Sequence, residues 1–415
     1  FSFFNPALTT SLSFSFQQPL LNGLGYAQNK RFILVAKNDR EISNQVFLQQ
    51  VMDTVRDVTN AYWELVFARE DVKVKEQSLA LAEKLYNDNK RQVEIGTLAP
   101  IEVVRAESEV ARTRQDLIVS QTTLRQQQIT MKDLIAKNPM EPLLALVEIV
   151  PTEAVEVPEL PEVLPVQDAS QIAMEKRPEV IQAQLNLKNQ ELHLKAVRRS
   201  MLPTVNAFAF YSGRGLSGIG GVPVFDQNTG EFIRRDVLVT RGLGTSLTQA
   251  LQSDFPDYGF GLSITIPIKN RQGQADMARQ QLQERQAKVR YRRTVNQLIK
   301  EVRNAQISLE QSRARIEAAE KARLLAQETM EAEQKKFQLG ASTIFLVIQA
   351  QRDLAAARSL EVRARVDFKE AQVSFDRALG RTLERSNVKV EDAQTGTVSA
   401  WLNPPSSTRT TRAGH

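Results

Sequence analysis

The chain of 415 residues is 42% hydrophobic but only 6% aromatic, so a thick globular core is not expected and thin, extended packing is favoured. Its 54 basic and 48 acidic residues give a formal net charge of +6, and because they are mixed along the sequence they do not predict a nucleic-acid-binding surface. The absence of cysteine excludes disulfides, thiolate metal sites and cysteine catalysis.

Residues 1–138 are predicted to form a strand followed by a helical hairpin. Apolar side chains alternate with serine and threonine near the start, which indicates a strand. No glycine or proline occurs from Tyr26 to Ile95, and Gly96 can then adopt the positive φ that ends a helix. The expected elements are a strand over 8–18, a long helix over 24–95, a tip over 96–100 and a return helix over 101–138.

A second unit of the same kind is predicted over residues 171–380, after a connector rich in proline and acidic residues over 139–170. In its strand over 257–268, apolar residues alternate with small or polar ones over the length that a tilted strand needs to cross a bilayer. Its other strand places Phe208 and Phe210 on one face. The expected elements are a helix over 171–201, a strand over 203–211, a glycine-rich external loop over 212–256, a strand over 257–268, a long helix over 273–339, a tip over 340–343, a return helix over 344–380 and a partly disordered tail over 381–415.

The two units are copies of one another at a constant offset of 244 residues. This offset aligns Gly96 with Gly340, and the apolar residues that follow each glycine also coincide. Within the helices the apolar positions recur every seven residues, which predicts helices coiled about one another. The heptads comprise Val58, Leu65, Val72, Leu79, Tyr86 and Val93 in the first copy, Val302, Leu309, Ile316, Arg323, Met330 and Phe337 in the second, where Arg323 is the one position that is not apolar, and an alanine series at Ala350, Ala357, Ala364, Ala371 and Ala378.

No stretch approaches the roughly 18 to 20 uninterrupted apolar residues of a membrane-spanning helix, so any membrane crossing is expected to use strands. The first copy shows no counterpart of the helix over 171–201 or of the strand over 203–211. We therefore expect the sequence to be truncated at its N-terminus, with three recognisable strands instead of four.

Several phrases resemble the TolC family of outer-membrane efflux and secretion ducts, among them "SFQQPLLNGLGYAQNKR", "IGTLAPIEVVRAESEVA" and "LGASTIFLVIQAQRDLA". The resemblance implies a mainly α protein with a membrane β-barrel portion: a homotrimer that forms a periplasmic α-barrel and a twelve-stranded β-barrel in the outer-membrane bilayer. It implies a passive exit duct of a tripartite efflux pump or type I secretion system. The partners would be a periplasmic adaptor (membrane fusion protein) and an inner-membrane pump or ABC transporter.

The same resemblance implies functional positions at the two helix tips. Adaptor docking would involve the residues around each tip glycine, namely Gly96, Thr97, Leu98, Ala99, Pro100, Gly340, Ala341, Ser342, Thr343 and Ile344. A periplasmic gate would involve Glu102, Arg105, Leu346 and Gln349. Family members often carry an acidic ring at the positions of Leu346 and Gln349, so we do not expect such a ring here. The alternative is that these four side chains only pack the tip.

Two other protein classes remain open at this point. A soluble periplasmic coiled-coil adaptor or scaffold would use the same heptads, although it would not need strands of membrane length. An enzyme is disfavoured because the two histidines, His193 and His415, cannot build a metal cluster or a histidine-based triad, and no phosphate-binding loop is present. We therefore predict no catalytic residue, no metal site, no cofactor and no nucleic-acid partner.

Overall fold

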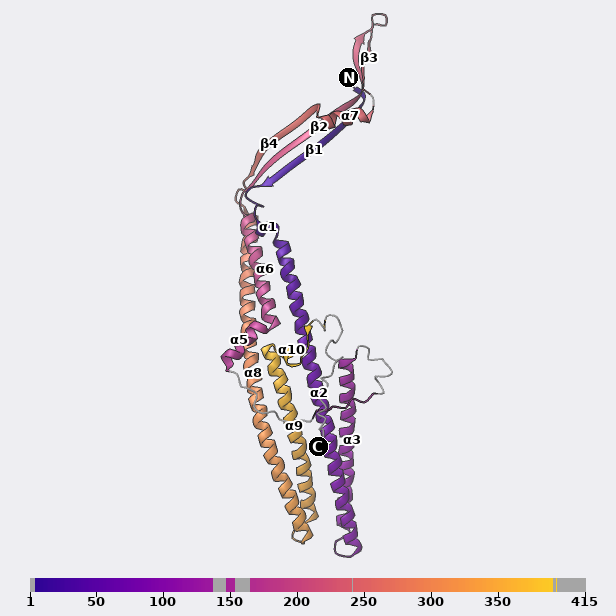
Figure 1. The fold of residues 1–415 in the computed structure, drawn as a ribbon, viewed down its shortest axis with the longest axis vertical. Helices are drawn as coiled ribbons and strands as arrows, with labels where there is room; N and C mark the ends of the chain where they lie inside the picture. The colour runs from indigo at the N-terminus through magenta and orange to yellow at the C-terminus, as the bar shows by residue number, and fades with distance from the viewer. Residues whose placement is uncertain (1–3, 137–146, 154–164, 241, 391–392, 394–415) are drawn as a thin grey trace, which may run out of the picture. The chain divides into compact units, whose positions relative to one another are not determined.

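The computed structural model describes residues 4–136, 147–153, 165–240, 242–390 and 393 (Figure 1). The chain divides into two compact units. One comprises Phe1–Arg40 and Leu185–Val289 and contains all the strands of the described residues, and the other comprises Glu41–Gln184 and Arg290–His415 and is helical. In the described part of the chain, no helix is long and apolar enough to span a membrane.

Helices account for most of the described chain, and the longest two follow the stretches that lack glycine and proline. The first of these predicted helices is interrupted at Lys30, which separates a short helix from a long one. The helices are α1 (Tyr26–Asn29), α2 (Arg31–Glu94), α3 (Ile101–Ile135), α5 (Val166–Lys176), α6 (Pro178–Ser200), α7 (Leu243–Gln252), α8 (Arg271–Gln338), α9 (Ile344–Leu379) and α10 (Thr382–Arg385).

The helix expected over 171–201 consists of two helices, α5 and α6, that meet at Arg177. Arg177 has an extended backbone with φ −76 and ψ 125 because the following Pro178 disfavours the helical conformation of the residue before it. Helix α5 begins after Pro165, inside the stretch expected to be a connector. The rest of that connector lies largely outside the described residues, as does most of the tail expected to be disordered.

The strands form one antiparallel sheet around the long strand β2. The four strands are β1 (Phe4–Pro19), β2 (Thr204–Phe225), β3 (Phe232–Thr240) and β4 (Phe255–Thr265). Strand β1 pairs along one edge of β2, whereas β4 and β3 pair with successive parts of its other edge. The expected external loop over 212–256 is therefore wrong, because it contains the second half of β2, all of β3 and α7. Its glycines obscured the strand pattern in the sequence.

Register assigns each side chain of the sheet to one of two faces. Phe14 pairs with Tyr211, which pairs with Tyr258, and residues directly opposite one another share a face. The apolar face carries Leu12, Phe14, Phe16, Val205, Ala207, Ala209, Tyr211, Tyr258, Phe260, Leu262 and Ile264. The polar face carries Ser11, Ser13, Ser15, Ser212, Arg214, Asp257 and Ser263.

Phe208 and Phe210 lie on the polar face, as do Leu216 and Phe255. Phe208 pairs with Gly261 and Phe210 with Gly259. A Cβ atom added at Gly259 would lie 2.7 Å from Cε1 of Phe210, so the ring covers the glycine. Each aromatic ring thus uses space that the glycine of the neighbouring strand leaves open.

The helical hairpins pack as the heptads predict. In the second hairpin Val302, Leu309 and Ile316 of α8 are buried against Ala364 and Phe368 of α9, within one core cluster. In the first hairpin Leu65 of α2 is buried with Met131 of α3. Small residues on α9 allow close approach of its partner helix, so the predicted heptad packing is confirmed.

Candidate docking and gating site at the helix tips

Each helical hairpin ends in the same backbone motif, built on Gly96 in the first copy and on Gly340 in the second. Their φ angles are +84° and +75°, in the left-handed region that glycine adopts without a Cβ clash. The N–H of Gly96 donates to the carbonyl oxygen of Val93 (3.0 Å), and the N–H of Thr97 donates to that of Gln92 (2.9 Å). The second tip repeats both bonds. Both tips therefore close with a Schellman motif, which confirms the expected role of the two glycines as helix ends.

Both tips also expose large apolar side chains at equivalent positions of the repeat. Ile95 is 77% exposed and Leu339 is 84% exposed, just before the glycines. Ile101 and Phe345, just after the tips, are 54% and 59% exposed. These four residues were not predicted from the sequence, although their apolar character at duplicated positions outside the heptad indicates an exposed apolar site.

The predicted docking residues are mostly at the surface, with one exception. Seven are exposed, namely Gly96, Thr97, Ala99, Pro100, Gly340, Ala341 and Thr343, while Leu98 and Ser342 are half-buried. Ile344 is only 2% exposed and packs with Leu85, Val347 and Ile348. The assignment of Ile344 as a docking residue is therefore wrong, because its side chain belongs to the core that joins α9 to α2.

The four predicted gate residues lie one to two turns above the tips and are held within their own helices. Arg105 Nη1 lies 3.1 Å from Glu102 Oε1, which compensates the charge of that carboxylate. Gln349 Nε2 donates to Asp353 Oδ1 (2.9 Å), and Leu346 is 46% exposed. The structure thus brings Glu102 and Arg105 together on α3, whereas Leu346 and Gln349 lie on α9.

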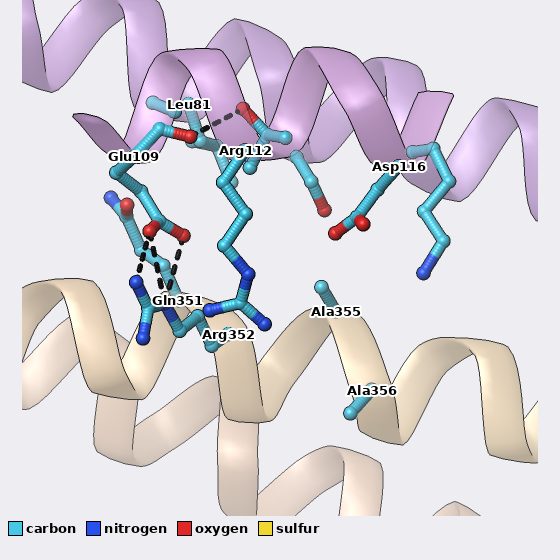
Figure 2. Close-up of a pocket in the computed structure, with 12 residues that line it drawn as sticks. Leu81, Glu109, Arg112, Asp116, Gln351, Arg352, Ala355 and Ala356 are labelled. Atoms are coloured by element: carbon cyan, nitrogen blue, oxygen red, sulfur yellow. Dashed lines mark hydrogen bonds and ion pairs between the residues drawn. The ribbon is translucent and has the colours of Figure 1, made fainter. Parts of the chain in front are cut away.

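A charged contact joins the two hairpins near these gate residues. Glu109 of α3 is 4% exposed, and both of its carboxylate oxygens lie 3.0 Å from Nε of Arg352 of α9. Figure 2 shows the guanidinium group of Arg352 facing this carboxylate, beside a small cavity of about 130 Å³. Arg112 and Asp116 of α3 line the same cavity. The ionic pair orients α9 against the first hairpin.

Further polar pairs continue this contact along α9, and we call the set the polar seam. Arg363 Nη1 donates to Glu64 Oε1 (2.7 Å), and Ser359 Oγ donates to Asp71 Oδ1 (2.6 Å). The polar seam comprises Glu109–Arg352, Asp71–Ser359, Glu64–Arg363 and Asp53–Arg377. Arg352 and Ser359 are seven residues apart, as are Glu64 and Asp71, so this part of the seam has the same seven-residue spacing as the apolar core.

A half-buried carboxyl group adjoins the seam at Glu370. Burial raises its pKa to about 7, and the neighbouring carboxylate of Glu64 contributes in the same direction. Arg363 Nη2 lies 3.9 Å from Glu370 Oε2 and offsets part of this effect. Among the described residues, no three histidine, aspartate or glutamate side chains are grouped so as to hold a metal ion.

Comparison with known proteins identifies relatives of the same architecture. A family described as "Outer membrane efflux protein" matches residues 3–137 and 169–381. No curated protein matches this chain.

The solved outer-membrane channel CmeC of Campylobacter jejuni shares 13% identity with this chain over 94% of this chain and 80% of CmeC, with a TM-score of 0.65. VceC of Vibrio cholerae shares 14% over 90% of this chain and 87% of VceC (TM-score 0.63). MtrE of Neisseria gonorrhoeae, solved in its open state, shares 18% over 91% and 81% (TM-score 0.61). These likenesses establish the fold. Since the family match covers most of both copies of the repeat, the chain belongs to the outer membrane efflux protein family.

Proposed function

We propose that this chain forms a passive exit duct as a homotrimer and docks its helix tips on a periplasmic adaptor that links it to an inner-membrane pump. Membership of the outer membrane efflux protein family assigns the chain to the outer membrane and to the exit of an efflux system. The trimer, the adaptor and the residues that contact it are our proposal. Nothing in this role requires catalysis by the chain, because transport through an open duct needs no chemical step.

Assembly is supported by the edges of the sheet. In the described residues β1 and β4 each pair with β2 alone, which leaves an outer edge on both strands. Unpaired backbone N–H and C=O groups in hydrocarbon cost several kcal/mol each, so strands in lipid must close into a barrel. Other copies of the chain would supply the missing neighbours.

Orientation of the sheet in that barrel follows from its two faces. The apolar face carries Phe260, which is 90% exposed, and Phe14, which is 65% exposed. The polar face carries a hollow lined by Ser11, Ser13, Ser212 and Arg214. We therefore place the apolar face toward lipid and the polar, hollowed face toward a water-filled lumen.

One observation supports adaptor docking at the tips: large apolar side chains are exposed at equivalent positions of both hairpins. Ile95 and Ile101 in the first copy match Leu339 and Phe345 in the second, and all four are more than half exposed. A partner with helical hairpin ends of its own could bury them in two equivalent contacts. The neighbouring gate residues would then lie where docking can act on them.

The experiment replaces Leu339 and Phe345 with aspartate, singly, and measures both dye efflux and co-purification of the adaptor from cross-linked cells. Leu325 is the matched control, because it lies on α8, which ends just before Leu339, and is 66% exposed but far from the tip in sequence. We expect Leu339→Asp and Phe345→Asp to lose adaptor and efflux while the trimer persists, and Leu325→Asp to retain both. Full adaptor recovery with both tip variants would refute docking at these residues.

A further inference from the structure

Helix α7 is held tightly against the apolar face of the sheet. A Cβ atom at Gly215 would overlap the carbonyl oxygen of Ser246, and one at Gly213 would overlap that of Ala250. Ser246 and Ala250 are 0% and 2% exposed. The hydroxyl groups of Ser246 and of Thr10 on β1 are hydrogen-bonded at 2.7 Å. Because Gly213 and Gly215 share the face of Tyr211, α7 lies on the face that we place toward lipid.

The C-terminal end of α7 lies next to the end of the apolar band. Tyr211 and Tyr258 are paired on the apolar face, 41% and 72% exposed, and Gly213 follows Tyr211 by two residues along β2. Tyrosine is enriched where a membrane protein passes from hydrocarbon to water, since its ring is apolar and its hydroxyl is polar. These strand ends are remote in sequence from α6 and α8, so α7 lies at the far end of the strands from the long helices.

One flank of α7 is a row of leucines that faces β1. Leu243, Leu247 and Leu251 are spaced four residues apart and are 64%, 41% and 61% exposed. Gln249 Oε1 accepts a hydrogen bond from the N–H of Leu216 on β2 (2.9 Å), while Ser246 reaches β1. At 100° per residue the order around the helix is Gln249, Ser246 and then the leucines. The leucine row therefore lies on the β1 side.

Strand β1 supplies matching side chains. Leu8 is 42% exposed and pairs with Ser217, whose hydroxyl donates to the carbonyl oxygen of Gly242 (3.0 Å) at the start of α7. Leu12 is 39% exposed and pairs with Gly213, which lies beneath Ala250 near the end of α7. Together these side chains form an open leucine ledge, defined as Leu8, Leu12, Leu243, Leu247 and Leu251.

We propose that the leucine ledge seats acyl chains of the outer leaflet and that α7 is an interfacial helix fixing the depth of the channel in the membrane. The ledge contains only aliphatic side chains, and neither α7 nor the segment from Leu8 to Phe16 has a charged residue. Phe14 extends the same face toward the apolar band. Continuity with that band favours lipid over a protein partner as the occupant. The inference rests on the membrane placement given in the proposed function.

The absence of cysteine allows a direct test, because each single-cysteine variant carries one nitroxide label and no other. Leu247→Cys, Phe260→Cys and Asn228→Cys would be labelled in the full-length trimer in phosphatidylcholine vesicles. Collisions with oxygen, which concentrates in lipid, are then compared with collisions with a water-soluble nickel chelate. We expect Phe260 to report deep lipid, Asn228 in the turn between β2 and β3 to report water, and Leu247 to report lipid at shallow depth.

Two results at Leu247 would overturn the proposal. A label as water-accessible as that at Asn228 would show that the ledge lies in solvent, and one shielded from both reagents would show that protein, including another copy, covers it. Loss of oxygen contact at Phe260 would instead count against the membrane placement itself, so the two failures are distinguishable.

A further substitution tests the packing of α7 against β2. Gly215→Val places a side chain where the carbonyl oxygen of Ser246 lies, while Ala209→Val adds bulk on the same strand and face outside α7. We expect the valine at position 215 to shift the Leu247 label toward water by several-fold in the collision ratio, with Phe260 unchanged, and the control to leave both unchanged. An unshifted Leu247 label in Gly215→Val would contradict the packing of α7 as an interfacial helix.

Discussion

Protonation of Glu370 should control the stability of the contact between the two hairpins at pH values near neutral. The carboxyl group faces Glu64 of α2 and has Arg363 and Asp367 on its own helix α9. Burial, together with the charge of Glu64, raises its pKa from 4.5 to about 7. A native-state pKa above the unfolded value means that the folded protein favours the protonated form. The cost of ionising this group is therefore fully present above about pH 7 and absent below about pH 4.5.

Glu370→Gln removes the titrating group and keeps its shape. The difference between about 7 and 4.5 corresponds to about 3 kcal/mol at about 1.4 kcal/mol per pKa unit. We expect the glutamine variant to be more stable than the parent by up to about 3 kcal/mol near pH 8 and by little near pH 5. The glutamine also loses the attraction to Arg363, which reduces the increase in stability. The test is therefore the sign of the change in unfolding free energy and its dependence on pH, not its exact size.

Urea unfolding of the purified protein in detergent, followed by tryptophan fluorescence at about pH 5 and about pH 8, measures this effect. Trp63 is a suitable reporter because it is buried and lies 5.3 Å from Nζ of Lys369, the neighbour of Glu370. Glu317→Gln on the exposed surface of α8 is the matched control. Equal stabilisation at both pH values, or none near pH 8, would refute a raised pKa at Glu370.

Three further predictions follow from the helices and their tips. Burial opposes ionisation of Glu179, but hydrogen bonds from Arg177 and Arg377 outweigh burial and lower the pKa of Glu179 from 4.5 to about 2. The ionised carboxylate therefore stabilises the folded protein above pH 4.5, and this contribution is lost on acidification toward pH 2. Glu179→Gln should therefore cost about 3 kcal/mol at neutral pH and little near pH 2, as measured by denaturant unfolding. Gly340→Val forces a β-branched residue to φ +75°, at a cost of roughly 1–2 kcal/mol. We expect this variant to lose dye efflux while trimers still form, and the control Ala80→Val, at an exposed position of α2, to retain efflux. Full efflux by Gly340→Val would count against a role for the tip. Glu109→Arg and Arg352→Glu should each destabilise the protein, and the double variant should recover much of the lost stability. We expect a coupling energy of about 0.5–3 kcal/mol in this double-mutant cycle. Purely additive losses would argue against the pairing of Glu109 with Arg352.

The long helices and their ends could be predicted because they depend on local signals. Glycine and proline are absent over long stretches, and heptads such as Val302, Leu309 and Ile316 predicted the buried face of α8. Gly96 and Gly340 predicted the tips, since a Schellman motif needs a residue at positive φ. These features need only residues near one another in sequence.

The sheet was harder to predict because register is a relation between strands. Alternation within β2 separates Phe208 from Ala209, but it does not show which of them shares a face with Phe14. Helix α7 was missed for a related reason. Gly213 and Gly215 suggest a loop in sequence, whereas in the structure they leave room for the backbone of a helix.

The polar seam was missed because the sequence analysis treated charged residues as a solvated surface. Arg352, Ser359 and Glu109 lie on helix faces that would be exposed in an isolated hairpin. Only the approach of a second hairpin buries Glu109. A search for polar residues at heptad spacing beside the alanine series would have indicated such a contact.

The distribution of apolar and polar contacts determines which parts of this chain can move. Inside the second hairpin, a large apolar cluster holds α8 and α9 together, so separating these helices exposes an extended core, whereas the cluster of the first hairpin, around Leu65 and Met131, is smaller. Between the hairpins, the apolar clusters of the described residues are small, one around Leu85 and Ile344 and one around Trp63 and Val366. Further contacts between the hairpins include the pairs of the polar seam and a hydrogen bond from Arg358 to Gln77 (3.0 Å). Their groups bond to water when they separate, so each contributes about 1.5–3 kcal/mol net. A rotation of one hairpin against the other therefore costs less than the opening of the second hairpin, and we propose it as the motion by which docking at the tips would widen the gate.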